Sequence, residues 1–108
     1  MKGRKVFWTF DAETDLLEVF EYILRDRPRA ALKVLTAIRR RCEMLRLNPE
    51  RNRIVPEFQA IGIVNYREIV FKPYRIIYKL TPAASYVIAV VDSRRDLGAF
   101  LFERLMRL

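Results

Sequence analysis

Three strand-like runs separated by very short connections constrain the fold of this chain more than any other feature. Residues 64–71, 74–80 and 86–91 are rich in the β-branched and aromatic residues that favour strands. Only two residues separate the first run from the second, and five separate the second from the third. Connections this short cannot carry a crossover, so the runs are predicted to pair as an antiparallel meander.

An opening strand and two helices are predicted ahead of the meander. Residues 5–10 (KVFWTF) have the composition of a strand, and Asp11 is expected to cap the helix that follows. Apolar residues then recur at helical spacing up to Pro28, which ends one helix and suits the first turn of the next. The second helix is predicted to stop at Asn48, which precedes a proline. Two helices on one face of a small antiparallel sheet make an α+β fold.

A last helix is predicted over residues 97–108, and it carries more apolar residues than one buried stripe requires. One side is expected to pack on the sheet, which leaves Phe102 and Met106 as candidates for contact with a partner. The competing interpretation is that a small domain simply exposes a few apolar side chains. At this length the whole chain, residues 1–108, is predicted to be a single domain.

The residue content excludes several classes of site. The chain has no histidine and one cysteine, Cys42, which rules out an internal disulfide, a multi-cysteine zinc site and histidine-dependent nucleophilic catalysis. Cys42 falls on the apolar stripe of a helix and is interpreted as inert packing. No metal or other cofactor is expected. No apolar run approaches the ~20 residues that span a bilayer, and no secretion signal is evident, so a cytoplasmic protein without membrane association is expected.

Positive charge is concentrated after the first predicted helix. The formal net charge is +8, from 21 Lys and Arg against 13 Asp and Glu. Residues 1–24 hold three basic and five acidic residues, whereas residues 25–65 hold ten and four, and residues 66–108 hold eight and four. Such a surface attracts nucleic acid or an acidic protein, and composition does not choose between them. Solubilising charge is the simpler alternative.

Six basic residues in and after the predicted sheet form a candidate binding surface. If the faces of neighbouring strands coincide, their guanidinium groups converge and hold a phosphate or carboxylate through forked hydrogen bonds. Such a cluster can also stabilise the transition state of RNA cleavage without a metal. The alternative is that the arginines pair with neighbouring acids, Arg94 with Asp92 or Asp96 for example. The six residues are Arg67, Lys72, Arg75, Lys79, Arg94 and Arg95.

The segments YREIVFKPYRIIYKL and YVIAVVDSRRD, with the order of elements, resemble the RelE/ParE toxin superfamily of bacterial toxin–antitoxin modules. The shared pattern is an arginine-led strand, a short turn, a YR-I-I-Y strand and a valine-rich strand that ends in paired arginines. The resemblance covers nearly the whole chain. It implies a small basic toxin that a cognate antitoxin inactivates by wrapping an extended and helical segment around it. Arg75 would then occupy the central-strand position that faces the functional surface.

This superfamily divides in mechanism, because RelE-like members cleave messenger RNA in the ribosomal A site whereas ParE-like members poison DNA gyrase. On the RelE pattern, Arg67, Arg75 and Arg94 fall at basic positions that would hold the scissile phosphate. Ile69, however, stands where RelE has a lysine that serves as its general base. Phe100 falls near the place of a RelE tyrosine. Cleavage needs groups that transfer protons, and Glu68 and Lys72 are the possible replacements, although alternation turns Glu68 to the face opposite Arg67. These departures count against RNA cleavage.

The resemblance therefore implies a ParE-like toxin that a cognate antitoxin neutralises. Without that antitoxin, it would inhibit DNA gyrase without hydrolysis, by binding through the basic sheet face and the adjoining loops. The first alternative is a RelE-like, ribosome-dependent endoribonuclease that acts on messenger RNA with Arg67, Arg75 and Arg94 as its catalytic residues. The second is a non-toxic nucleic-acid-binding domain, whose affinity for naked DNA or RNA would fall steeply with salt.

Overall fold

The computed structural model describes residues 3–106 and contains one four-stranded sheet with helices on both of its faces. Arg107 and Leu108, the end of the predicted last helix, lie outside the described residues. The elements in chain order are β1 (Lys5–Trp8), α1 (Phe10–Leu24), α2 (Pro28–Glu43), the 3-10 turn η1 (Met44–Arg46), α3 (Pro56–Gln59), β2 (Tyr66–Phe71), β3 (Tyr74–Leu80), β4 (Ala84–Asp92) and α4 (Leu97–Met106).

The sheet contains the predicted meander, because β2 pairs antiparallel with β3 and β3 pairs antiparallel with β4. The opening strand β1 joins it by pairing parallel with β4, so the strand order is β1-β4-β3-β2. Parallel strands need a long crossover between them, and α1 and α2 form part of the one that connects β1 to the rest of the sheet. The predicted α+β class and order of elements are confirmed.

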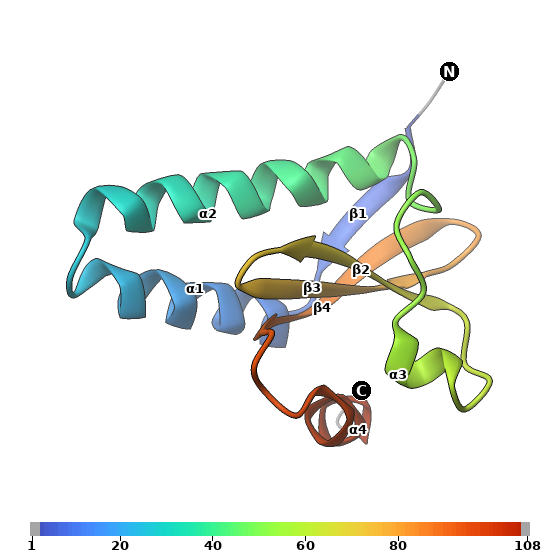
Figure 1. The fold of residues 1–108 in the computed structure, drawn as a ribbon. Coiled ribbons are helices and arrows are strands. Elements are labelled where there is room, and N and C mark those ends of the chain that lie inside the picture. Colours follow the sequence, from blue (N-terminus) through green and yellow to red (C-terminus); the bar gives the residue numbers. More distant parts are fainter. Residues whose placement is uncertain (1–2, 107–108) are drawn as a thin grey trace.

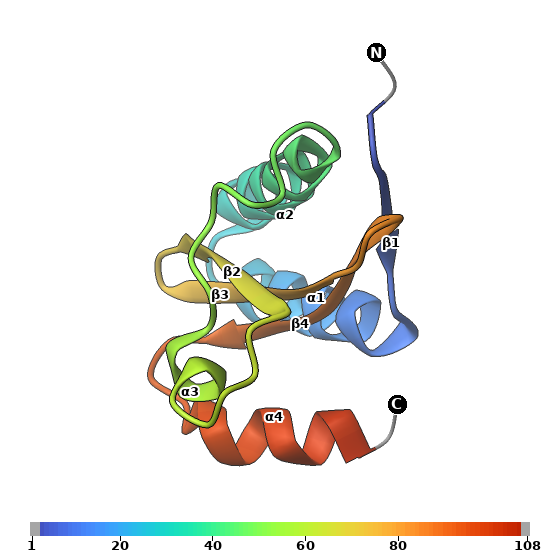
Figure 2. The ribbon, with the colours of Figure 1, turned by 90° about the vertical axis from the view of Figure 1, so that its right-hand side faces the viewer.

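Two separate cores lie on the two sides of the sheet. Figures 1 and 2 show α2 and α4 on opposite sides of it. We call the side covered by α1 and α2 the hairpin face, where Leu16, Ile38 and Ile76 are buried together. We call the other side the α4 face, where Ile77 packs with Leu101 of α4. Successive side chains of a strand point to opposite faces, so β3 contributes to both cores.

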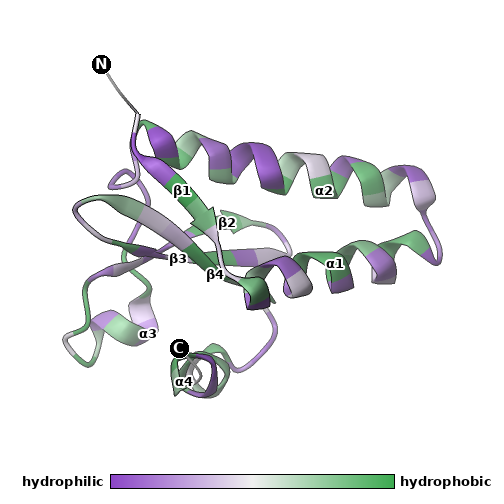
Figure 3. Cartoon of the chain, turned by 180° about the vertical axis from the view of Figure 1, so that it is seen from behind, coloured by the Kyte–Doolittle hydropathy of each residue, from purple (hydrophilic) through white to green (hydrophobic). Residues whose placement is uncertain are grey.

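The two long helices are amphipathic, as predicted. Figure 3 shows hydrophilic and hydrophobic segments alternating along α1 and α2. Leu16 and Ile23 of α1, and Ile38 and Cys42 of α2, are buried against the sheet. Among residues 3–106, no helix has the length and apolar character needed to cross a lipid bilayer.

The start of α1 differs from the prediction. Thr9 caps this helix rather than Asp11, because the extended backbone at Thr9 lets its Oγ1 accept a hydrogen bond of 3.2 Å from the amide of Ala12. The first strand consequently ends at Trp8, before the predicted residue 10.

The end of α2 also differs from the prediction. The helix ends at Glu43, and the 3-10 turn η1 continues the chain from Met44. The predicted stop at Asn48 is therefore several residues too late.

The connection between η1 and β2 is fixed to the sheet. An isolated bridge joins Ile54 to Arg67, and the amide of Val55 donates a hydrogen bond of 2.9 Å to the carbonyl of Tyr66. On the hairpin face, the hydroxyl of Tyr78 donates a hydrogen bond to the carbonyl of Pro49. This segment therefore extends the sheet edge at β2 and places α3 beside the α4 face.

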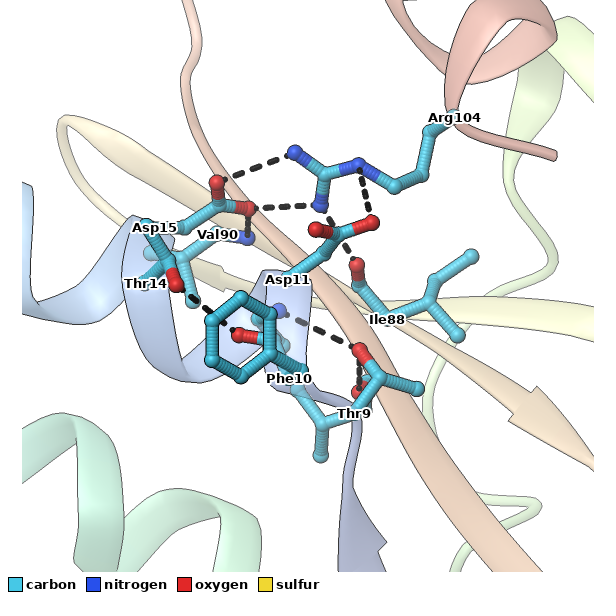
Figure 4. Close-up of polar contacts among 10 residues, drawn as sticks. Thr9, Phe10, Asp11, Thr14, Asp15, Ile88, Val90 and Arg104 are labelled. Carbon is cyan, nitrogen blue, oxygen red and sulfur yellow. Dashed lines mark hydrogen bonds and ion pairs between the residues drawn. The ribbon is translucent and has the colours of Figure 1, made fainter. Parts of the chain in front are cut away.

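A buried ion pair connects α4 to α1 across the edge of β4 (Figure 4). Nη1 and Nη2 of Arg104 lie 2.9 and 3.0 Å from the two carboxylate oxygens of Asp15, and Nη1 also donates to the carbonyl of Ile88 at 2.7 Å. Asp15 in turn accepts a hydrogen bond of 3.0 Å from the amide of Val90. Oδ2 of Asp11 lies 3.6 Å from Nε of Arg104, at the distance of an ion pair.

The Arg104–Asp15 pair occupies a part of β4 that β1 does not reach. The register of β1 along β4 ends with Trp8 opposite Val87. Burial lowers the pKa of Arg104, but the hydrogen bonds and charge of Asp15 outweigh it and raise that pKa above its ordinary value. Arg104 therefore stays charged, and the two side chains satisfy backbone groups that a longer first strand would otherwise have paired.

We expect Arg104→Met to lower the free energy of unfolding by about 3–5 kcal/mol, because Asp15 would remain buried without its cation. Urea denaturation followed by circular dichroism measures the change. Arg40→Met is the matched control, since Arg40 is exposed on α2 and should alter the midpoint little. Equal midpoints for the two variants would contradict the assigned role of Arg104.

We expect the thiol of Cys42 to be unreactive in the folded protein. The residue is fully buried, and burial raises its pKa from 9.0 to about 12. Because the folded pKa exceeds the unfolded one, the folded state should lose stability as the pH rises above about 9. Alkylation at pH 8, with and without urea, is the measurement, and fast modification of the native protein would argue against this burial.

Candidate functional site

The structure places the two central arginines of the predicted binding surface on opposite faces of the sheet. The register pairs odd-numbered residues of β2 with even-numbered residues of β3. Arg67 therefore lies opposite Tyr78 on the hairpin face, whereas Arg75 lies opposite Val91 on the α4 face. The two arginines therefore do not converge on one face of the sheet. The prediction required β2 and β3 to pair with Arg67 and Arg75 on the same face, and the observed pairing does not do this.

Arg67 holds the connection that precedes β2. Its Nη1 donates hydrogen bonds of 3.1 Å to the carbonyl of Glu50 and 2.7 Å to the carbonyl of Asn52. Asn52 also donates from its side chain to the hydroxyl of Tyr78, at 3.2 Å. The guanidinium of Arg67 is therefore engaged with the backbone of the chain itself.

Arg75 lies at the centre of a network of two acids and two arginines. Its Nε is 2.6 Å from Glu68, and its Nη1 and Nη2 are each 2.9 Å from the carboxylate of Glu57 on α3. Glu68 has no exposed side-chain surface and pairs also with Arg53. The hydrogen bond from Arg75 lowers the pKa of Glu57, and the same bond raises the pKa of Arg75. This network fixes α3 against the sheet.

The pairing of Arg75 with Glu68 and Glu57 was not predicted from the sequence. Alternation along β2 already turns Glu68 away from Arg67. In the observed register Glu68 lies opposite Ile77, and Ile77 and Arg75 are two residues apart on β3 and share a face. Glu68 and Arg75 therefore lie on the same face of the sheet. Glu57 belongs to a short helix within an irregular segment, and no periodic signal indicates its position.

Three of the six predicted basic residues do come together, at the end of the sheet where β2 turns into β3 and β4 ends. The amide of Ser93 donates a hydrogen bond of 2.7 Å to the carbonyl of Pro73, which brings the two segments side by side. We call these three residues the sheet-end group. They are Lys72, Arg94 and Arg95.

The members of the sheet-end group are accessible. Nη2 of Arg94 lies 2.6 Å from Asp92, as one alternative from the sequence predicted, yet its side chain remains 82% exposed. The hydrogen bond from Arg94 lowers the pKa of Asp92 to about 2. The guanidinium of Arg95 lies 4.6 Å from the ring centroid of Phe100. The sixth residue, Lys79, is half-buried at the opposite end of β3, opposite Tyr86.

Apolar side chains are exposed on α4 and on the strands β1 and β4. Phe102 and Met106 are 68% and 72% exposed, whereas Leu101 of the same helix is fully buried. On β1 and β4, Phe7 and Tyr86 stack with their ring centroids 5.3 Å apart, and both are partly exposed. These side chains are available to a partner, and that role for Phe102 and Met106 stays a prediction.

Within the described part of the chain, no group of three or more His, Cys, Asp or Glu side chains is placed to hold a metal ion.

This chain is similar to known toxin proteins in both sequence family and fold. The family model described as the ParE toxin of type II toxin–antitoxin systems, parDE, matches residues 6–97. A search of curated protein sequences gave no match. A structure of the chromosomal ParDE toxin–antitoxin system from P. aeruginosa superposes with a TM-score of 0.68 at 15% identity, and the match covers 82% of this chain and 95% of that one.

Two further solved structures extend the likeness to RelE proteins. E. coli RelE, as a double arginine-to-alanine mutant in the free state, gives a TM-score of 0.65 at 13% identity and covers 98% of both chains. The RelBE2 toxin–antitoxin complex from Mycobacterium tuberculosis gives 0.60 at 17% identity, over 83% of this chain and 98% of that one. At these identities the structural matches establish the shared fold, while the family model covers most of the sequence. The chain belongs to the ParE toxin family of type II toxin–antitoxin systems.

Proposed function

We propose that this protein inhibits bacterial growth by acting on DNA gyrase in the cytoplasm, and that a cognate antitoxin holds it inactive. The match of residues 6–97 to the ParE toxin family carries the proposal. Structural neighbours from the ParDE and RelBE2 systems belong to toxin–antitoxin pairs, which supports an antitoxin as the partner. The exposed side chains of Phe102 and Met106 offer that antitoxin an apolar surface.

The proposed inhibition proceeds by binding rather than by RNA cleavage. Cleavage requires a proton acceptor and a proton donor, and the chain has no histidine. Ile69, at the place of the RelE lysine, is 2% exposed in the core of the hairpin face. Phe100, near the place of the RelE tyrosine, packs its ring against Arg95 and Arg104 and has no hydroxyl to offer.

The accessible cations of the sheet-end group are the proposed contacts with gyrase. Lys72, Arg94 and Arg95 are exposed at one end of the sheet. Arg67 and Arg75 are engaged in internal hydrogen bonds, so we assign them to the stability of the fold. Lys79 is a further, half-buried candidate at the other end of β3.

One observation favours RelE-like cleavage of messenger RNA on the ribosome as a second candidate. The E. coli RelE structure matches 98% of this chain, whereas the ParDE structure matches 82%. In that alternative Arg67, Arg75 and Arg94 would hold the scissile phosphate. The position of Arg67 and Arg75 on opposite faces of the sheet weighs against this assignment.

Pulse labelling of DNA and protein synthesis, minutes after induction of the chain without its antitoxin, separates these candidates. We expect DNA synthesis to fall first. An early fall in protein synthesis alone would contradict the gyrase proposal and favour messenger RNA cleavage. Normal growth with both syntheses intact would contradict a toxic function for this protein.

A supercoiling assay with purified gyrase then tests the proposed contact surface. Arg94→Glu combined with Arg95→Glu should weaken inhibition, because the sheet-end group would lose most of its positive charge. Arg40→Glu is the control, since Arg40 is exposed on α2 and lies beside Gly3 and Arg46, near the end of the helix away from Arg27. Equal inhibition by the double variant and the control would contradict the surface assignment.

We expect Arg75→Ala to lower the free energy of unfolding by about 3 kcal/mol or more, because it leaves Glu68 buried with one arginine fewer. Arg94→Ala should leave the denaturation midpoint almost unchanged, since its side chain is 82% exposed. Thermal denaturation of both variants provides the test. Wild-type stability in Arg75→Ala would show that the guanidinium is free for a functional role.

A further inference from the structure

A cleft of about 580 Å³ opens between α1 and the end of the sheet, beside the sheet-end group. This volume is within the range of sites that bind small molecules. On one side, the cleft is lined by Tyr22 of α1 and by Pro73 and Tyr74 at the turn into β3. On the other side lie the arginines next to the start of α2 and the end of β4. The side chains that matter below are Tyr22, Arg27, Tyr74, Asp92, Arg94 and Arg95.

Several hydrogen-bond donors that line this cleft have no protein partner within residues 3–106. The hydroxyls of Tyr22 and Tyr74 make no hydrogen bond there, and Arg27 forms no ion pair. Arg27 precedes α2, and its side chain makes no capping bond to that helix. Tyr22 is 68% exposed, whereas Tyr74 is 8% exposed. The cleft therefore combines free donors with an open aromatic ring.

The acidic groups that line the cleft are largely neutralised by internal partners. Asp92 is paired with Arg94, and Asp15 is paired with Arg104. Glu18 is the acidic lining residue that remains, against the two lining arginines Arg27 and Arg95, and its charge also acts on Arg104. An anion is therefore favoured over a cation as the occupant.

The polar groups of the cleft line one common space. Burial raises the pKa of Tyr74, and the nearby groups Asp92 and Tyr22 raise it further, whereas the positive charges of Arg27 and Arg94 lower it. These five side chains come from α1, from the residue before α2, from β3, and from β4 and the turn after it. A ligand at this position would meet four donor side chains from separate parts of the chain, next to the carboxylate of Asp92 that Arg94 neutralises.

We propose that this cleft binds a nucleoside monophosphate group, with the phosphate held by Arg27, the hydroxyl of Tyr74 and Nη1 of Arg94, the guanidinium nitrogen that does not bond to Asp92. A phosphate offers three terminal oxygens to these three donors, one more than a carboxylate has, and arginine forks suit it well. The base packs against the exposed ring of Tyr22, since aromatic side chains stack on any base. The group is supplied either by a free mononucleotide or by the 5′-phosphorylated end of a single strand. This site does not rest on the action proposed for gyrase.

Titration of the purified chain with AMP, followed by amide NMR, tests the site. We expect shifts concentrated around Tyr22, Arg27 and Tyr74, with affinity falling about tenfold or more in Arg27→Ala, because a charge-assisted hydrogen bond is lost. Tyr74→Phe removes only the hydroxyl and should also weaken binding. The matched controls Arg29→Ala and Phe10→Leu, at exposed positions that do not line the cleft, should bind as the wild type does.

Different ligands test the phosphate contacts and the stacking of the base separately. Adenosine and inorganic phosphate should each bind more weakly than AMP, and Tyr22→Leu should reduce the advantage of AMP over phosphate. A tetraadenylate with a 5′-phosphate that binds more tightly than AMP would identify a strand end as the source, whereas equal binding would identify the free nucleotide. Absence of shifts at millimolar AMP, equal binding of adenosine, or the same loss in Arg29→Ala as in Arg27→Ala would overturn the proposal.

Discussion

The pair formed by Asp15 and Arg104 resolves a problem that the short first strand creates. β1 covers β4 only as far as Val87, so the next backbone groups on that edge need other partners. Asp15 accepts from the amide of Val90, and Arg104 donates to the carbonyl of Ile88. The two side chains also neutralise each other. The edge of the sheet, the first helix and the last helix therefore depend on one interaction.

Four arginines of the predicted binding surface divide into two groups by their surroundings. Arg67 and Arg75 are engaged inside the molecule and fix the connection before β2 to the two faces of the sheet. Arg94 and Arg95 remain accessible at the end of the sheet. A surface built from the second group suits recognition of a partner, whereas phosphoryl chemistry would need a convergent set with a proton acceptor.

Local patterns explain which parts of this structure could be predicted. Helical spacing in α1 and α2, and the short turns of the meander, depend on neighbouring residues, and both were predicted correctly. The separation of Arg67 from Arg75 depends on the register of β2 against β3, which a shift of one residue would reverse. The pairing of Asp15 with Arg104 joins positions 89 residues apart, and no periodicity reports such a contact.

The burial of Arg104 restricts how α4 can sit on the sheet. Rotation of a helix by one residue turns each side chain by roughly 100°, and a slide by one full turn moves it by about 5.4 Å. Either displacement would carry Arg104 away from Asp15 and leave a carboxylate buried alone. An entirely apolar contact through Leu97 and Leu101 would tolerate intermediate positions, but a paired charge does not. The last helix therefore has one stable position on the sheet, and it is either packed there or detached.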